Sequence, residues 1–157
     1  MFYKVLNSAL KENDIVYSTG LNIDKKFDDS YLNGMYFYSF EKIISWLTHG
    51  SKLAFISIPD DSKVIHFEGD VSKADKIYID RIIDVKDLEM WNDEQICLEA
   101  VKQNGKSLQY VRNQTDALCL EAVKQNGFAL EYVRNRTDVI VLEAMKQNPA
   151  VFEFLKN

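Results

Sequence analysis

A unit of 22 residues occurs three times in succession in the last two-fifths of this 157-residue chain. The motif Leu-Glu-Ala-Val-Lys-Gln-Asn-Gly begins at Leu98 and again at Leu120, and Leu142 begins a third version in which methionine and proline replace valine and glycine. Such close self-similarity predicts a helical repeat array, because a unit this short cannot bury its apolar face without a neighbour. The three units are named copy 1 (residues 93–114), copy 2 (115–136) and copy 3 (137–157).

Each copy has the pattern of two short helices. Apolar residues at helical spacing predict the first helix, and an aspartate that follows threonine or asparagine, such as Asp116, is expected to cap its N-terminus. Asn126 and Gly127 are expected to end this helix, with the glycine in the left-handed conformation. In copy 3, Pro149 replaces that glycine and suits the first turn of the second helix. The prediction is a short α-solenoid of three helical hairpins over residues 90–157, with Met90 and Trp91 as a cap on copy 1.

Stacking would turn each repeated residue into a row along the array. The basic rows are candidate contacts for a partner protein, although Glu–Lys pairs three residues apart on a solvated face would explain the lysine row equally simply. The rows of glutamine and asparagine at the helix ends are more typical of caps than of a binding surface. The candidate binding residues in these rows are Lys102, Lys124 and Lys146 in one row, and Arg112 and Arg134 in another.

The end of copy 3 carries large apolar residues at positions that a following copy covers in copy 2. These residues are Phe152, Phe154 and Leu155. Arrays of this kind usually end in a polar cap, and an uncovered apolar patch favours association. Phe152 and Phe154 are therefore candidate contacts with another protein or with a second copy of the chain.

Residues 1–89 have no repeat and show a mixed α/β pattern. Short apolar runs separated by turn residues predict strands, and Phe40 to His49 has the spacing of one amphipathic helix with Ser39 and Gly50 as caps. Little helix lies between the strands, so the predicted fold class is α+β with a small, mainly antiparallel sheet followed by the α-solenoid. The predicted strands are 2–6, 15–17, 34–38, 53–58, 64–67 and 76–83, and Gly20 is expected in a turn.

Composition and charge exclude several classes of function. The net charge of −5 gives no basic field for nucleic acid, and no apolar run approaches the ~20 residues of a membrane helix. The first residues lack the pattern of a secretion signal, which predicts an intracellular protein. Cys97 and Cys119 occupy equivalent positions in copies 1 and 2 and are expected to be buried, reduced thiols.

No residue pattern predicts catalysis, a metal site or a cofactor. His49 and His66 are the only histidines, and neither belongs to a recognisable catalytic or metal-ligating set. The prediction for function is therefore a non-enzymatic adaptor, in which residues 1–89 form a head domain and residues 90–157 bind another protein.

The core of the repeated unit, Leu-Glu-Ala-Val-Lys-Gln-Asn-Gly, resembles a repeat family of unknown function that is abundant in mimivirus-like giant viruses of amoebae. The segments 17–22, 33–37 and 73–77 resemble a unit that precedes repeat arrays in the same viruses. The resemblance implies a viral protein in the host cytoplasm or the virion, and it brings no catalytic residues.

The N-terminal region also resembles ADP-ribosyltransferase folds. Gly34-Met35-Tyr36-Phe37 is similar to their Gly-x-Tyr-Phe strand, and Tyr17-Ser18-Thr19-Gly20 lies near the place of their His-Gly pair. This resemblance implies, as the alternative function, a divergent NAD-binding domain centred on Tyr17, Thr19, Tyr36 and Asp80. No histidine stands in the His-Gly position, and Asp80 is the nearest acid in the last strand.

Overall fold

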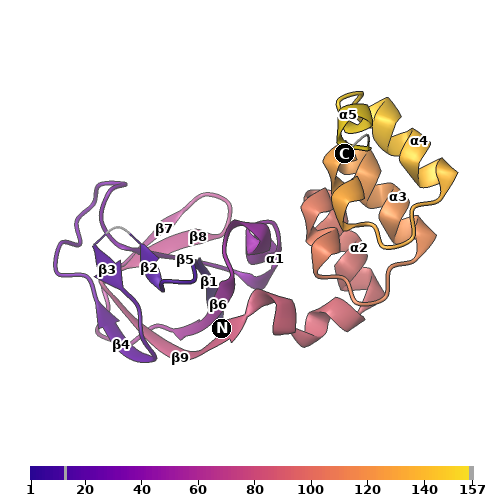
Figure 1. Ribbon diagram of the computed structural model, residues 1–157. Coiled ribbons are helices and arrows are strands. Elements are labelled where there is room, and N and C mark those ends of the chain that lie inside the picture. The colour runs from indigo at the N-terminus through magenta and orange to yellow at the C-terminus, as the bar shows by residue number, and fades with distance from the viewer. Residues whose placement is uncertain (13, 156–157) are drawn as a thin grey trace. The chain divides into compact units, whose positions relative to one another are not determined.

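A computed structural model describes residues 1–12 and 14–155, with the side chains of 154 and 155 left out of the description. The chain divides into two compact units, Met1–Asp87 and Leu88–Asn157 (Figure 1). Each unit is described by itself below.

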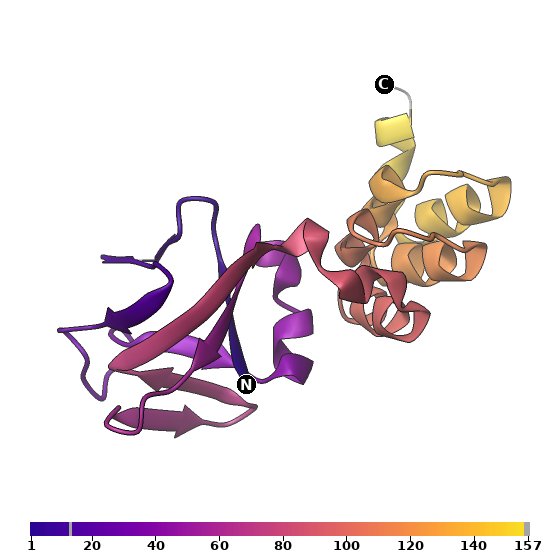
Figure 2. The ribbon, with the colours of Figure 1, turned by 90° about the horizontal axis from the view of Figure 1, so that it is seen from below.

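The N-terminal unit contains a seven-stranded sheet in which every neighbouring pair is antiparallel (Figures 1 and 2). The strand order is β4-β9-β6-β1-β5-β8-β7, and β2 and β3 form a separate two-stranded sheet. The strands are β1 (Phe2–Leu6), β2 (Lys11–Glu12), β3 (Ile15–Val16), β4 (Gly20–Ile23), β5 (Met35–Tyr38), β6 (Lys52–Ser57), β7 (Val64–Phe67), β8 (Val71–Ala74) and β9 (Lys76–Asp84).

The predicted mixed α/β class with an antiparallel N-terminal sheet is confirmed. Two strands of this sheet are additional to the prediction. Gly20 does not lie in a turn but begins β4, where its φ of 95° is open to glycine without strain. Strand β8 contains Lys73, which is fully buried. Because lysine is typically a surface residue, the sequence of β8 does not show the apolar pattern by which a buried strand is recognised.

The predicted single helix from Phe40 to His49 is wrong in its length. The structure has α1 (Phe40–Ile44) followed by the 3₁₀ helix η1 (Leu47–His49). Ser39 is the N-cap of α1, as expected, and its side chain accepts a hydrogen bond from the backbone N–H of Lys42. Gly50 ends η1 with an extended backbone, at a place where any Cβ would overlap Val5 and the main chain of Leu6. Packing against β1 therefore decides where this helix stops.

The core of the N-terminal unit is built mainly from residues of the seven-stranded sheet. Met35, Ala54, Ile56 and Ile77 are fully buried, and Leu6 joins them at 2% exposure. Along β5, buried residues alternate with partly buried ones, so Met35 and Phe37 share the face of the sheet that lies in this core.

The C-terminal unit contains three α-helices of ten residues that begin 22 residues apart. They are α2 (Glu94–Gln103), α3 (Asp116–Gln125) and α4 (Asp138–Gln147). Helix α3 packs against both α2 and α4, and the three lie side by side in Figure 2. The remaining elements are η2 (Val85–Asp87) in the preceding unit, and η3 (Glu89–Asn92), η4 (Gly105–Gln109), η5 (Gly127–Tyr132) and α5 (Val151–Leu155) in this one.

The residue that caps each long helix differs from the prediction in two copies. Asp93 caps α2, and its carboxylate accepts from the N–H groups of Gln95 and Ile96. In α3 and α4 the cap is the threonine before the aspartate, Thr115 or Thr137, and the aspartate is the first helical residue. A hydroxyl at the cap leaves the carboxylate free to interact with the positive end of the helix dipole.

The expected left-handed glycine at the end of the long helices is also wrong. Asn104 and Asn126 end α2 and α3 with an extended backbone, and their side chains then cap η4 and η5 by accepting from the N–H of Lys106 and of Phe128. The asparagine row therefore caps helices, as predicted. Each of these asparagines ends a long α-helix and also caps the N-terminus of the 3₁₀ helix that follows it.

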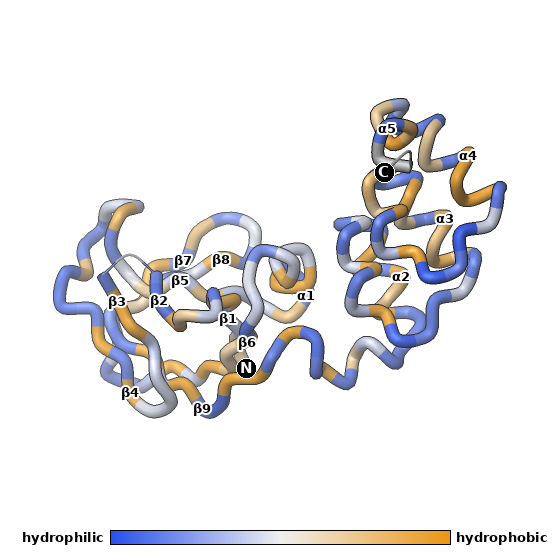
Figure 3. The backbone as a smooth tube through the Cα atoms, viewed as in Figure 1, coloured by the Kyte–Doolittle hydropathy of each residue, from blue (hydrophilic) through white to orange (hydrophobic). Residues whose placement is uncertain are grey.

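Along α2, α3 and α4, apolar and polar residues alternate in Figure 3, so each helix has one face for the interior of the unit. Ala100, Val101, Ala122 and Val123 are fully buried. Trp91 of η3 is also fully buried and stacks on Tyr110 with ring centroids 5.2 Å apart. None of the helices within the described residues is both long enough and apolar enough to cross a membrane.

Candidate functional site

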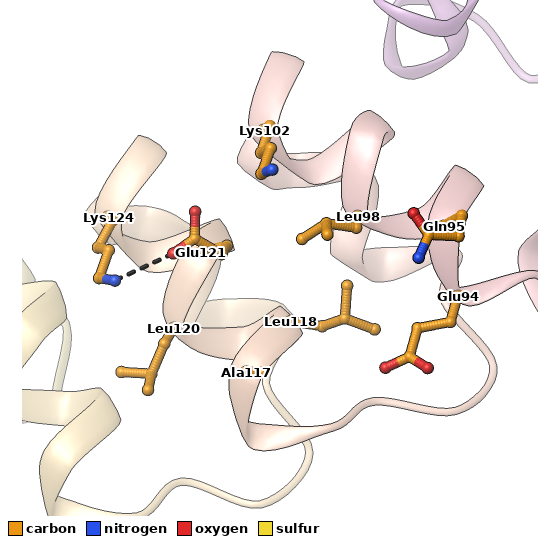
Figure 4. A pocket seen from close by; sticks show the side chains of 9 residues that line it. All are labelled: Glu94, Gln95, Leu98, Lys102, Ala117, Leu118, Leu120, Glu121 and Lys124. Atoms are coloured by element: carbon orange, nitrogen blue, oxygen red, sulfur yellow. Dashed lines mark hydrogen bonds and ion pairs between the residues drawn. The ribbon is translucent and has the colours of Figure 1, made fainter.

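A candidate site in the C-terminal unit is an open groove of about 660 Å³ between α2 and α3. Leu98 of α2 and Leu118 of α3 point into the space between the two helices (Figure 4). The full lining is Glu94, Gln95, Leu98, Lys102, Ala117, Leu118, Leu120, Glu121 and Lys124. The aliphatic side chains of this groove could contact apolar residues of a bound segment, and the charged side chains at its borders could contact charged residues of the same segment.

On α2 the groove lies along one face of the helix, because its lining positions 95, 98 and 102 are separated by three and four residues. The same face of α3 carries Ala117, Leu120 and Lys124. On α4 the equivalent face carries Val139, Leu142 and Lys146.

The leucines of this face, Leu98, Leu120 and Leu142, are named the leucine row. Leu98 and Leu120 are partly buried, whereas Leu142 is 65% exposed. Val139 beside it is 64% exposed. The apolar character of the face is therefore most accessible on α4.

The two borders of this face carry opposite charges. Acidic residues stand in the first turn of each long helix, and lysines stand in the last turn, as the helix dipole favours. The acidic border consists of Glu94, Asp116 and Asp138, and the basic border of Lys102, Lys124 and Lys146.

Two of the three lysines predicted as binding residues form ion pairs within their own helix. Lys124 Nζ lies 3.0 Å from Glu121, and this hydrogen bond raises the pKa of Lys124. Lys146 Nζ lies 3.6 Å from Glu143. In copy 1 the equivalent glutamate, Glu99, accepts instead from Gln103 Nε2 at 2.8 Å. In copies 2 and 3 the lysine row is therefore explained by Glu–Lys pairs three residues apart, which is the simpler of the two explanations.

The arginine row has a structural role at Arg134. Its guanidinium donates to the backbone oxygens of Arg112, at 2.7 Å, and Val111, at 2.9 Å, and so links copy 2 to copy 1. Arg112 is exposed, and its backbone N–H donates to the carbonyl oxygen of Trp91 at 3.3 Å. Arg134 thus contributes to packing between copies, which its place in the sequence did not indicate.

At the end of copy 3, Phe152 is 47% exposed, whereas Leu130 at the equivalent position of copy 2 is fully buried. The backbone of Phe154 belongs to α5, but its side chain, like that of Leu155, lies outside the described part of the structure. Val151, one residue earlier, is fully buried and anchors α5.

The four residues of the NAD-binding alternative lie in different surroundings. Tyr17 is 1% exposed, and its hydroxyl donates to Glu12 at 3.0 Å, so its ring is not open to a ligand in this structure. The Tyr36 hydroxyl donates to the carbonyl oxygen of Tyr31. Thr19 and Asp80 are exposed.

Two buried lysines in the N-terminal unit were not predicted. Lys4, 1% exposed, lies 2.5 Å from the carboxylate of Glu12 and donates to the carbonyl oxygen of Tyr36 at 2.9 Å. Burial lowers the pKa of Lys4, and the Glu12 charge opposes that change. Burial of the phenol, together with the same Glu12 carboxylate, raises the pKa of Tyr17. This group joins β1 to the β2–β3 hairpin.

Lys73 holds a long loop between β4 and β5. Its ammonium is fully buried and donates to three backbone oxygens, those of Asp28 (2.7 Å), Asn33 (2.8 Å) and Ser30. Every proton of the ammonium can therefore have a carbonyl acceptor, which offsets the cost of its burial. Both buried lysines serve the fold of this unit.

The histidine and cysteine side chains that could support other chemistry have simple structural surroundings. His66 Nδ1 lies 2.8 Å from Ser72 Oγ, but the two residues are cross-strand partners on β7 and β8, where such pairs stabilise a sheet. Burial raises the pKa of the Cys97 and Cys119 thiols, both of which are free and buried. Over residues 1–12 and 14–155, no cluster of three or more His, Cys, Asp or Glu is placed to hold a metal ion.

Fold and site together define a protein with an antiparallel α+β unit and an all-helical unit that carries an apolar groove with charged borders. Residues 87–114 and 117–157, the helical part, match the family model of a domain of unknown function, DUF4116. Neither the curated proteins nor the solved structures include a match to this chain.

Proposed function

We propose that the chain is an adaptor whose C-terminal unit is a short α-solenoid of three helical hairpins and binds an amphipathic helix of another protein. The observation that carries the proposal is the leucine row, which places an apolar side chain on the same face of α2, α3 and α4. Apolar surface left accessible in this way commonly marks a binding site.

The spacing of the leucine row supports a helical partner. Neighbouring packed helices lie about 8–10 Å apart, so leucines of successive copies recur at about that distance. Seven residues of an α-helix span about 10.5 Å. A partner helix laid across α2, α3 and α4 could therefore present one apolar residue to each copy if its apolar residues recur at heptad spacing.

The charged borders add a preference for orientation. The acidic border would face basic residues of the partner, and the lysine border would face acidic residues. Because these charges are exposed and two lysines are already paired, they contribute more to specificity and to the rate of association than to affinity.

A display library of helical peptides of about 20 random residues, selected on the full chain, tests this proposal. We expect the selected peptides to carry apolar residues at heptad spacing and to lose at least about tenfold in affinity when Leu120 or Leu142 becomes aspartate. The matched control is Val16→Asp, since Val16 is 67% exposed in the N-terminal unit and resembles Leu142 in accessibility.

The proposal fails if the selected peptides bind Leu120→Asp and Leu142→Asp as tightly as the natural chain. It also fails if Val16→Asp abolishes binding while both leucine variants retain it, because the binding surface would then lie on the N-terminal unit. Circular dichroism of each variant verifies that the helical content is unchanged.

A further inference from the structure

Adjacent copies of the C-terminal unit are joined by a recurring contact between a glycine and a glutamine. The backbone N–H of Gly105 donates to Gln125 Oε1 at 2.7 Å, and the N–H of Gly127 donates to Gln147 Oε1 at 2.6 Å. In each case the glutamine belongs to the next copy. The glutamine row, expected to cap helix ends, therefore holds successive copies together.

The same contact leaves no space for a side chain on the glycine. A Cβ on Gly127 would lie 2.6 Å from the carbonyl oxygen of Ala144 and 2.8 Å from Gln147 Oε1. A Cβ on Gly105 would overlap the carbonyl oxygen of Ala122 in the same way. Neither glycine has a positive φ, so close approach by the next helix, and not backbone conformation, is the reason for glycine here.

Copy 3 has Pro149 at this position. Proline has no backbone N–H to donate, and its ring carbons would occupy the space that the next helix requires. The local structure of copy 3 tolerates the change, because Asn148 still accepts from the N–H of Ala150 at 3.0 Å, as Asn104 and Asn126 do for their own copies. The substitution thus removes the docking contact and keeps the cap.

We propose that Pro149 closes the array, so that the end of copy 3 does not accept another unit of the same kind. The surface there includes Leu142 and Phe152, which are 65% and 47% exposed. Apolar area alone would favour a further helix on this surface. Pro149 excludes a helix that docks through the glycine–glutamine contact, as copies 2 and 3 do. A partner at this end must therefore bind without that contact.

Three extended forms of the full chain test the inference. In the first, the sequence of residues 115–136 follows residue 157 after a single glutamine, which keeps the 22-residue period, and Pro149 is retained. The second is identical but carries Pro149→Gly. The third, a positive control, has the same segment inserted between Arg136 and Thr137, where the added unit follows the glycine of copy 2.

Amide hydrogen exchange of the added helix, followed by mass spectrometry, is the measurement. We expect exchange to be at least about 100-fold slower in the Pro149→Gly extension and in the internal insertion than in the extension that retains Pro149. Equal protection in both C-terminal extensions would overturn the inference. So would an added helix that is protected in the internal insertion but remains unprotected after Pro149→Gly.

Discussion

The backbone N–H of Gly127 lies 2.6 Å from Gln147 Oε1, a hydrogen bond between residues twenty positions apart that joins copy 2 to copy 3. Its counterpart joins Gly105 to Gln125 at 2.7 Å. Because a buried N–H without a partner costs free energy, each of these contacts makes the stability of one copy depend on the next.

Replacing Gly127 with alanine is expected to destabilise the C-terminal unit by about 1–3 kcal/mol, because the new Cβ would meet the Ala144 carbonyl oxygen. Urea unfolding followed by the fluorescence of buried Trp91, in a Trp46→Phe background, measures the effect. Pro149→Ala is the matched control at the equivalent position of copy 3 and should change stability much less. Equal losses in the two variants would contradict the steric role of Gly127.

Gln147→Ala is expected to cost about 1–3 kcal/mol, since it leaves the Gly127 N–H without its acceptor. The control is Gln103→Ala in copy 1, where the side chain donates to exposed Glu99 and accepts from no glycine among the described residues. The same urea titration compares the two. If Gln103→Ala proves as costly as Gln147→Ala, the glutamines act through helix propensity and not through docking.

Ser107→Ala is expected to stabilise the C-terminal unit by about 1 kcal/mol. The Ser107 hydroxyl oxygen is fully buried and has no hydrogen-bond partner among the described residues, so its removal relieves a desolvation cost. Copies 2 and 3 carry the apolar residues Ala129 and Val151 at the same position, both fully buried. A lower midpoint of thermal unfolding for Ser107→Ala would contradict this prediction.

The N-terminal unit should gain stability with rising pH through the titration of Lys4. Burial lowers the folded-state pKa of Lys4, so over the range between that pKa and the unfolded value of 10.5 the unfolded chain binds more protons. Unfolding free energies of the natural chain and of Lys4→Met, compared from neutral pH to about 10, measure this term. A dependence on pH that is identical in both chains would contradict it.

Tyr17 provides the opposing term at the upper end of the same range. Its pKa is raised in the folded state, so above the ordinary tyrosine value of 10.0 the unfolded chain loses a proton that the folded chain retains, and stability falls. Tyr17→Phe should remove this loss. The stability of the unit is therefore expected to rise towards pH 10 and to decline beyond it.

The sequence alone determined the period of the helical part and the positions of its long helices, because identical residues at 22-residue intervals impose the same local hydrogen bonds and the same apolar face on each copy. It also determined the antiparallel character of the N-terminal unit. Short strands with little helix between them leave few ways to pair.

Only the tertiary structure decided the role of individual residues in contacts between distant segments. Gly127 has the pattern of a helix end, yet its need for glycine comes from a carbonyl oxygen of the next copy. Lys73 has the chemistry of a surface residue, yet three backbone oxygens that lie 40, 43 and 45 residues earlier in the chain make its burial possible. Local sequence encodes local hydrogen bonding and periodicity, whereas the acceptor for a buried N–H exists only after the chain has folded.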